Sequence, residues 1–334
     1  MRTGYLKMNY RTFGRLGWQV SEIGYGTWGG GSGPGGWQGC TDQEVLEAMH
    51  ESVRLGCNFF DTAWVYGRGH SEQLVGAVVR SLPAKKLYVA TKIPPKNMLW
   101  PCPKGARFEE VFPEDFVHEY LHKSLTNLGL SRIDLIQFHV WQDSWASEKG
   151  WQKLVERLKL DGLVDAVGIS TNTWEPWNVL NTLKTGLIDS VQVIYNLFEQ
   201  QPEDELFPFC SKNGVAVIAR VPFDEGTLTG QINQQTKFSS DDWRSSYFVD
   251  ENLREAVPRA EQLKKLLPAA TSLPEMALRF ILENQAVSTV IPGMRRVKHV
   301  RSNLAVSDGT KLPLKLMQEL KRHRWDRTPT AWSQ

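Results

Sequence analysis

The chain has 334 residues, of which 41% are hydrophobic and 23% charged, so it contains enough apolar sequence to bury a large core. Its 39 basic and 37 acidic residues leave a formal net charge of +2. This balance excludes the strongly basic surface of a nucleic-acid-binding protein and gives no reason to expect a membrane surface as the partner. The expected partner is therefore a small soluble molecule, and the sequence sets no oligomeric state.

The cysteines and the N-terminal residues indicate a cellular compartment. Cys40, Cys57, Cys102 and Cys210 show no closely spaced pairs, and no apolar run approaches the roughly 20 residues of a membrane span. Residues 1–17 lack the apolar stretch of a secretory signal. We therefore expect a cytoplasmic protein with free thiols.

In chain order, the first predicted element is a hairpin over residues 8–20 that turns between Gly14 and Gly17. Eight β-rich runs then alternate with segments of helical period. The predicted strands are 21–27, 57–63, 86–92, 133–139, 164–170, 190–196, 215–221 and 287–293. The helical segments include 41–56, 71–82, 113–129, 150–162, 175–186 and 273–284.

Eight strands of continuous apolar character, each alternating with a helix, predict an α/β fold of the parallel (β/α)8 type, a TIM barrel. The prediction is one domain over residues 1–334, with the N-terminal β-hairpin as a plug at the bottom of the barrel. An open, doubly wound sheet is the alternative.

Three segments without a strand pattern predict long loops over the C-terminal mouth of the barrel: residues 94–113, residues 222–250 and the tail 323–334. Aromatic residues in two of them, Trp100 in the first loop and Trp325 and Trp332 in the tail, suggest an aromatic-lined cleft.

Barrel enzymes build their sites where the strands end at the C-terminal face. In chain order, the residues at those eight places are Trp28, Asp61, Lys92, His139, Ser170, Gln192, Arg220 and Gly293. Tyr66 lies five residues after Asp61. Each of these residues has an ordinary structural explanation alone, but an acid, a lysine, a histidine and a phenol at one mouth together favour a catalytic site.

Such a set suits acid catalysis at a carbonyl. A phenol with a pKa of about 10 is a poor proton donor at neutral pH, but the ammonium of Lys92 would lower that pKa. Asp61 would keep the buried Lys92 charged and oriented, and His139 would donate a hydrogen bond. This arrangement suits reduction of a carbonyl to an alcohol if a hydride donor lies alongside.

The blocks "FFDTAWVYGRGHSEQLVG", "ATK", "IDLIQFH", "GIS", "VQVIYN" and "IPGMR" occur in this order, and together they resemble the aldo-keto reductase family from about residue 9 to residue 305. The resemblance implies that Asp61, Tyr66, Lys92 and His139 form the catalytic tetrad, with Tyr66 as the general acid. It also implies an extended NADPH across the mouth, and it makes Trp28 a wall of the substrate site together with His139.

By the same resemblance, Ser170 and Gln192 hold the nicotinamide carboxamide, and Arg220 packs against the nicotinamide ring. The adenosine half and its phosphates are assigned to Gly293, Met294, Arg295, His299 and Asn303. Two positions depart from the family pattern. Thr171 stands where an asparagine is common, so the second amide contact comes from Thr171, from Asn172 or from neither, and Arg220 replaces an aromatic residue.

Two motifs are interpreted as coincidental. "HEYLH" at residues 118–122 matches a zinc-protease pattern, but the two histidines lie about 100° and 140° around the helix from Val117, off its apolar stripe, and no third ligand is evident. We expect no metal. "GSGPGG" at residues 31–36 matches a dinucleotide-binding pattern, but "WQGC" separates its last glycine from the next helix, so we interpret it as a flexible loop above the mouth.

The segment "IPGMRRVKHVRSN" bears on the choice of dinucleotide. Arg295 and Arg296 flank a predicted helix N-terminus, where backbone amides favour an anion, whereas Lys298 and Arg301 fit a solvated helix face. We expect the arginine pair to bind the 2′-phosphate that distinguishes NADPH from NADH.

The sequence thus predicts an NADP-dependent oxidoreductase that reduces an aldehyde or ketone, sugar carbonyls included, or catalyses the reverse oxidation. The alternative is a cofactor-binding regulatory or redox-sensing subunit that resembles potassium-channel β subunits. A barrel isomerase that uses the acid and the lysine without nicotinamide is a weaker third hypothesis.

Overall fold

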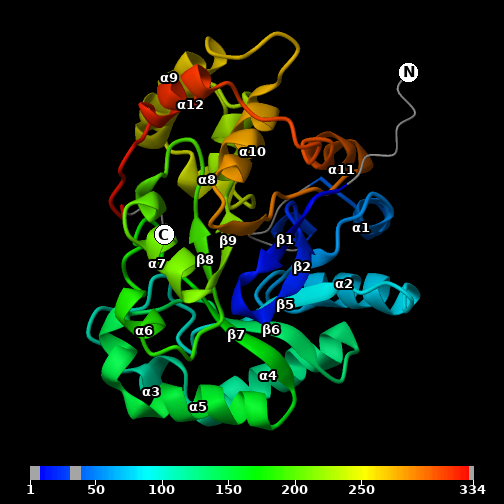
Figure 1. The fold of residues 1–334 in the computed structure, drawn as a ribbon, viewed down its shortest axis with the longest axis vertical. Helices are drawn as coiled ribbons and strands as arrows, with labels where there is room; N and C mark the ends of the chain where they lie inside the picture. Colours follow the sequence, from blue (N-terminus) through cyan, green and yellow to red (C-terminus); the bar gives the residue numbers. More distant parts are fainter. Residues whose placement is uncertain (1–7, 31–38, 331–334) are drawn as a thin grey trace.

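The computed structural model describes residues 8–30 and 39–330. Eight parallel strands form one sheet, each hydrogen-bonded to the next along the chain, and helices surround it (Figure 1). The strands are β3 (Tyr25–Gly26), β4 (Phe59–Asp61), β5 (Tyr88–Ile93), β6 (Ile133–Phe138), β7 (Val164–Ser170), β8 (Ser190–Ile194), β9 (Ala216–Arg220) and β10 (Val287–Val290). All eight predicted strands are present, and most are shorter than the apolar runs that predicted them.

The two outer strands of this sheet, β3 and β10, meet through isolated parallel bridges. These bridges pair Ile23 with Val290 and Gly26 with Gly293, and the Gly26 amide donates to the Pro292 carbonyl at 3.1 Å. A Cβ atom on Gly26 would lie 2.5 Å from the Ile291 carbonyl oxygen, so this closure requires a glycine. The strands therefore form the predicted (β/α)8 barrel rather than an open, doubly wound sheet.

Helices follow the barrel strands along the chain. They are α1 (Asp42–Arg54), α2 (His70–Ser81), α3 (Phe108–Val111), α4 (Glu114–Leu128), α5 (Lys149–Leu160), α6 (Leu180–Leu183), α7 (Leu206–Asn213), α8 (Arg244–Tyr247), α9 (Asp250–Lys264), α10 (Leu273–Glu283), α11 (Val297–Leu304) and α12 (Leu314–Lys321). The last two, α11 and α12, come after the final strand β10. The predicted helical segments did not include α7, α9 or α12, nor the one-turn helices α3 and α8. The sequence pattern did not predict α9, because the helix contains many charged residues and Pro258 lies in its interior.

The predicted helix over residues 175–186 is largely wrong, because only Leu180–Leu183 are helical. Side-chain hydrogen bonds fold the preceding residues into turns instead. Asn178 donates to Gln142 at 3.2 Å and to Glu175 at 2.9 Å. Such local side-chain hydrogen bonds favour turns over the regular backbone hydrogen bonds of a helix.

The N-terminal hairpin covers the bottom of the barrel, as predicted. Strands β1 (Tyr10–Phe13) and β2 (Trp18–Ser21) pair antiparallel. Phe13 and Val20 are fully buried against residues at the N-terminal ends of the barrel strands, among them Phe59 and Ala216. The Arg15 amide donates to the Gly214 carbonyl at 2.7 Å, which attaches the hairpin turn to the start of β9.

The long segments at the opposite end contain short helices. Residues 94–113 include α3, and residues 222–250 include α8 and a 3-10 segment at Asp224–Thr229. The tail leaves α12 and runs down one side of the molecule towards the C-terminus (Figure 1). Within residues 8–30 and 39–330, no helix has both the length and the apolar character needed to cross a membrane.

We expect Phe13→Ala to lower the free energy of unfolding by about 3–5 kcal/mol, because the variant leaves a cavity in the hairpin plug. Urea denaturation followed by circular dichroism measures this change. Thr12→Ala is the matched control, since Thr12 is exposed on the same strand and its replacement should change stability by about 0.5 kcal/mol or less. Equal effects of the two variants would mean that the hairpin does not act as a plug.

Candidate active site

Asp61, the last residue of β4, is the central acceptor of a polar cluster at the C-terminal end of the barrel. Its side chain is buried, and Oδ1 lies 2.6 Å from Lys92 Nζ. Oδ2 accepts hydrogen bonds from the side-chain amides of Gln192 at 2.7 Å and Gln137 at 3.2 Å. The buried apolar run ends in an acid because three buried donors need a common acceptor.

Lys92 is fully buried near the end of β5, and all of its protons have partners. Its Nζ donates to Asp61, to the Thr62 carbonyl at 2.8 Å and to the Tyr66 hydroxyl at 3.3 Å. Burial lowers the pKa of Lys92, but the neighbouring Asp61 and Tyr66 more than offset this, so its pKa lies above the usual value. Lys92 is therefore charged at neutral pH.

A tight turn after β4 brings the Tyr66 phenol to Lys92. The Tyr66 amide donates to the Ala63 carbonyl at 3.1 Å, and Gly67 and Gly69 take left-handed conformations with φ of 67° and 95°. The expectation that Lys92 lowers the pKa of Tyr66 is wrong for the net shift. Burial raises the pKa of Tyr66 by more than the nearby ammonium lowers it, so the phenol holds its proton at neutral pH.

His139 follows β6 directly and faces the phenol. Its ring lies edge-on to that of Tyr66, with 6.0 Å between the centroids. Burial lowers the pKa of His139 well below 6.5, and the charges of Lys92 and Arg220 lower it further. The imidazole is therefore neutral and carries one proton on one ring nitrogen.

Three tryptophans surround this cluster. Trp28 begins a 3-10 turn (Trp28–Gly30) just after β3 and stacks on Tyr66 at 6.2 Å, and Trp100 meets His139 at 5.6 Å. Trp243, which the sequence did not single out, packs against Trp28 with the rings tilted by 32° and their centroids 4.5 Å apart. Of the predicted cleft residues, Trp100 lies at the site. Trp325 packs against Phe198 instead.

Of the residues predicted to hold the nicotinamide, Ser170 ends β7, Gln192 lies in β8 and Arg220 ends β9. Ser170 and Gln192 are buried, and the Gln192 amide nitrogen already donates to Asp61. Arg220 Nη2 donates to the Thr171 carbonyl at 3.1 Å, while its buried Nε has no hydrogen-bond partner among the described residues.

The two residues after Ser170 have different surroundings. Asn172 donates to the Trp141 carbonyl and to Glu175, both at 2.9 Å, so its amide is used within the fold. The Thr171 hydroxyl lies 3.3 Å from the Gln192 carbonyl. Of the three alternatives for the second amide contact, the structure therefore disfavours Asn172.

The residues predicted to hold the adenosine half lie between β10 and α11. Gly293 is exposed, and no atom of residues 8–30 or 39–330 lies within 4 Å of the position that a Cβ atom would take. Met294 is buried, and its carbonyl accepts a hydrogen bond from Tyr25 at 2.5 Å. Arg295 is partly buried and packs across Gly29, where a Cβ atom would lie 2.7 Å from its side chain.

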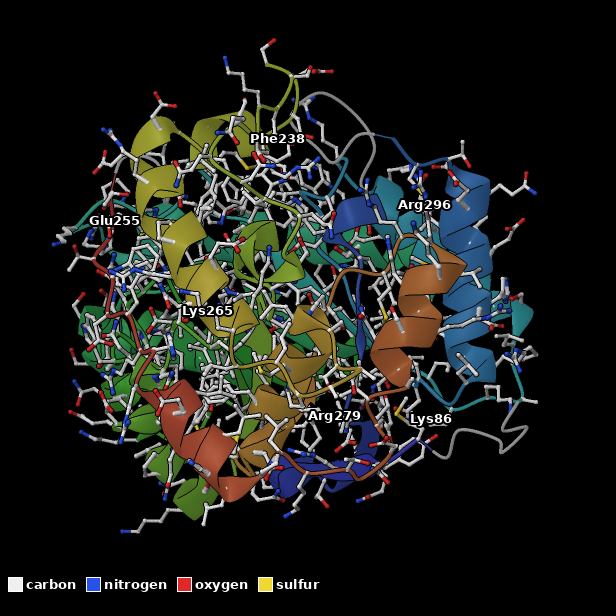
Figure 2. The ribbon with its side chains drawn as sticks, turned by 90° about the horizontal axis from the view of Figure 1, so that it is seen from above. Lys86, Phe238, Glu255, Lys265, Arg279 and Arg296 are labelled. Atoms are coloured by element: carbon white, nitrogen blue, oxygen red, sulfur yellow. The ribbon has the colours of Figure 1, made fainter. Side chains whose placement is uncertain are left out.

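On α11 and at its start, the remaining polar residues differ in exposure. His299 is exposed and Asn303 is buried. Arg296 caps the helix beside α1 (Figure 2), donating to the Gly39 carbonyl at 2.8 Å with its Nε 3.3 Å from Glu44. Arg301 forms a surface ion pair with Glu51 at 2.8 Å.

Of the two motifs interpreted as coincidental, "HEYLH" lies within the described residues. In α4, His118 lies 3.9 Å from Glu114 and His122 is exposed. Within the part of the chain that the structure describes, no group of three or more His, Cys, Asp or Glu side chains could hold a metal ion. "GSGPGG" lies outside the described residues, as does Trp332.

A family model for the aldo/keto reductase family matches residues 22–324. The chain belongs to this family. It is 28% identical to the NADH-specific methylglyoxal reductase of Escherichia coli (strain K12) over 86% of this chain and 89% of that protein. It is also 28% identical to L-galactose dehydrogenase of Arabidopsis thaliana, over 90% and 88% of the two chains.

Solved structures agree with this assignment to the aldo-keto reductases. The glycerol dehydrogenase of Gluconobacter oxydans superimposes with a TM-score of 0.75 at 26% identity, covering 94% of each chain. An aldo-keto reductase from Bacillus halodurans in its holo form gives the same TM-score at 24% identity, covering 98% of this chain and all of that one. The fold is therefore the family's (β/α)8 barrel.

Sequence reasoning missed two groups that complete this aldo-keto reductase site. Gln137 lies inside β6, where its side chain reaches Asp61, and a glutamine within an apolar run was the available signal. Trp243 lies in the 222–250 insertion, which has no periodic pattern that would place a side chain.

The "HEYLH" helix leads to a prediction about the zinc content of the protein. Because its two histidines have no further ligands within the described chain, purified protein should contain no stoichiometric zinc and should keep its activity after chelation. Metal analysis by mass spectrometry and an assay after dialysis against EDTA measure this. One zinc per chain, lost together with activity in His118→Ala, would contradict the interpretation.

Proposed function

We propose that the protein is an NADPH-dependent aldo-keto reductase that reduces an aldehyde or ketone to the alcohol, or catalyses the reverse oxidation. The observation that carries the proposal is the buried chain of contacts from Asp61 through Lys92 to the Tyr66 hydroxyl, beside a neutral His139. These groups suit proton transfer to a carbonyl oxygen.

Each residue has a distinct role in this proposal. Tyr66 is the general acid, and its raised pKa keeps it protonated before the reaction. His139 donates a hydrogen bond that orients and polarises the carbonyl oxygen. Once the proton has left Tyr66, the ammonium of Lys92 stabilises the phenolate, and Asp61 keeps that ammonium charged and in place.

Features of the mouth fit a nicotinamide dinucleotide. Among the described residues, a buried guanidinium nitrogen of Arg220 lacks a partner, and none fills the space beside the Gly293 Cα atom. Ser170, Gln192 and Arg220 would hold the nicotinamide half. Gly293, Met294, Arg295, His299 and Asn303 would hold the adenosine half. When bound in reduced form, the dinucleotide would supply a hydride, which is two electrons and one of the two hydrogens that a carbonyl gains on becoming an alcohol; the other hydrogen would be the Tyr66 proton.

We propose a small-molecule carbonyl compound as the substrate, sugar carbonyls included. The printed names of relatives support this range, because they include a methylglyoxal reductase, an L-galactose dehydrogenase and a glycerol dehydrogenase. Trp28, Trp100 and Trp243 would form apolar walls of the site. The balanced net charge supports no nucleic-acid or membrane partner, and four free cysteines support a cytoplasmic location.

Steady-state consumption of NADPH with a panel of aldehydes, ketones and sugars tests this function. Multiple turnovers per protein molecule would establish an enzyme. A regulatory subunit of the kind that resembles potassium-channel β subunits would instead bind the cofactor without sustained turnover, and an isomerase would neither need nor bind it.

Tyr66→Phe should lower kcat by about 10²–10⁴-fold while NADPH still binds, because proton transfer by a positioned group contributes this much. Lys92→Met should act similarly, since the phenolate loses the charge that stabilises it. Stopped-flow rates and fluorescence titration of NADPH measure the two quantities. Tyr10→Phe is the control, because its hydroxyl donates to the Gly56 carbonyl at the far end of the barrel. A near-normal kcat in Tyr66→Phe would assign the acid to another residue.

The start of α11 predicts a preference for NADPH over NADH of at least about tenfold, because each charge-assisted hydrogen bond to the 2′-phosphate contributes about 1.5–3 kcal/mol. The preference should shrink as salt concentration rises. Replacing Arg295 and Arg296 with alanine should weaken NADPH binding and leave NADH nearly unchanged, as measured by titration calorimetry.

Arg301→Ala is the matched control for this pair, because Arg301 lies within α11, which the pair precedes, and like Arg296 it forms an ion pair with a glutamate of α1, here Glu51. Equal losses for both dinucleotides in the double variant would mean that the arginines hold the pyrophosphate or the fold. A wild-type preference for NADH, the cofactor in the name of the Escherichia coli relative, would refute the cofactor assignment.

A further inference from the structure

The C-terminal tail carries a buried arginine into the rim of the barrel mouth. The Arg327 side chain is 4% exposed, and its Nη1 lies 2.8 Å from Oδ1 of Asp224, whose side chain is 2% exposed. Nε and Nη2 of Arg327 have no hydrogen-bond partner among the described residues. The ion pair with Asp224 is thus the polar contact through which this guanidinium is held.

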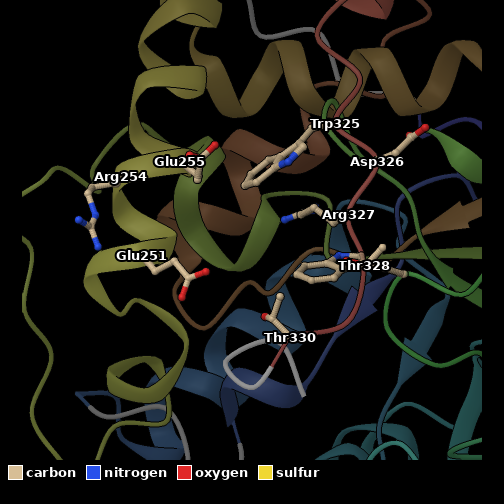
Figure 3. Close-up of a pocket in the computed structure, with 9 residues that line it drawn as sticks. Glu251, Arg254, Glu255, Trp325, Asp326, Arg327, Thr328 and Thr330 are labelled. Atoms are coloured by element: carbon tan, nitrogen blue, oxygen red, sulfur yellow. The ribbon is translucent and has the colours of Figure 1, made fainter.

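Two indole rings enclose the same guanidinium. Its central carbon lies 4.5 Å from the ring centroid of Trp174 and 4.8 Å from that of Trp325. Figure 3 shows Arg327 beside Trp325 in the wall of a pocket of about 580 Å³ between the tail and α9. Trp174 belongs to the loop after β7, and Asp224 to the loop after β9. Arg327 therefore joins the tail to two loops of the mouth.

Attaching the tail does not by itself require a buried charge. Three residues earlier, Arg324 forms ion pairs at 2.6 Å with Asp204 and with Asp326, and all three side chains remain partly or largely exposed. Exposed pairs cost little desolvation, whereas a buried pair is costly to make and more costly to break. We therefore expect the Arg327–Asp224 pair to hold the backbone around Asp224 in its conformation, and not only to attach the tail.

Asp224, the partner of Arg327, lies in the turn over residues 221–226. Val221, Asp224 and Glu225 all have positive φ, of 56°, 47° and 56°. Such conformations are unfavourable for residues other than glycine and persist only where surrounding contacts hold them. Asn196 donates to the Val221 carbonyl at 2.9 Å at the start of the turn, and Arg327 holds Asp224 in its middle.

This turn begins directly after Arg220, the last residue of β9. Arg220 bonds to the Thr171 carbonyl, and its charge contributes to the low pKa of His139 after burial and Lys92. Glu225, within the turn, also interacts with Arg220: burial raises the pKa of Glu225 to about 7, and the Arg220 charge opposes this rise. The conformation of the turn therefore affects both the position and the electrostatic environment of Arg220.

We propose that Arg327 is a positioning residue of the active site: by holding Asp224 it fixes the turn 221–226, and with it the placement of Arg220 beside the nicotinamide half of the cofactor. This inference rests on the proposed function, because it needs a dinucleotide at Arg220. It makes the tail a part of the cofactor site although no tail residue belongs to the tetrad.

The test compares Arg327→Met with the control Arg324→Met, which removes an exposed ion pair from the same tail. NADPH dissociation constants are measured by fluorescence titration, kcat and KM by steady-state assays, and Tm by calorimetry. Arg327→Met should weaken NADPH binding by roughly tenfold, within the range usual for coupling between sites. Arg324→Met should bind NADPH as the wild type does.

Two further variants separate positioning from folding. Arg327→Lys keeps the charge and should recover part of the affinity. Asp224→Asn combined with Arg327→Met leaves no unpaired buried charge, so it should recover Tm but not NADPH affinity, because the turn still lacks its anchor. These variants also carry the test if Arg327→Met does not fold.

A lower Tm with unchanged NADPH affinity and unchanged KM in every Arg327 variant would overturn the inference and leave the tail a structural element. Recovery of NADPH affinity together with Tm in the double variant would do the same, since it would show that only the unpaired charge mattered. A wild-type protein that binds neither NADPH nor NADH would instead refute the proposed function, which distinguishes the two failures.

Discussion

The ion pair between Asp61 and Lys92 is the interaction on which the candidate site depends. A lysine that is fully buried and a carboxylate that is nearly so are each costly to place in a core, and each is stable here only because the other lies 2.6 Å away. Two glutamine amides, the Thr62 carbonyl and the Tyr66 hydroxyl complete the hydrogen bonding. The position of the phenol is thus determined by the requirement to satisfy the lysine.

The barrel makes this pair possible because neighbouring parallel strands bring their C-terminal ends together. Asp61 ends β4, Lys92 lies at the end of the adjacent β5, and His139 follows β6, so residues up to 78 positions apart meet at one mouth. Closure between β3 and β10 depends on the close backbone approach at Gly26. Once the strands are in register, the turn after β4 brings the Tyr66 hydroxyl to Lys92.

Two groups of residues meet at the mouth: residues of the strands and the turns that follow them, and residues of the long loops and the tail. Asp61, Lys92 and His139 lie on strands or directly after them, and Tyr66 lies on the turn after β4. Trp100, Trp243 and Arg327 come instead from the 94–113 loop, the 222–250 loop and the tail. Their contacts link these segments to the centre: Trp100 to His139, Trp243 to Trp28, and Arg327 to Asp224. In a barrel of this kind, variation in such loops can change the bound molecule while the residues at the strand ends stay fixed.

The sequence by itself predicted the eight strands and the hairpin plug, because apolar period is a local property that neighbouring residues specify. The sequence also singled out Asp61, Tyr66, Lys92 and His139, three of them by strand-end position, and their catalytic roles stay predictions. It did not determine the net pKa shift of Tyr66, since that shift depends on how much water the folded mouth excludes. Nor did it place Trp243 or pair Arg327 with Asp224, 103 residues apart. Such contacts leave no periodic signal in the chain and exist only after the loops and the tail have packed onto the finished barrel, so only the tertiary structure could decide them.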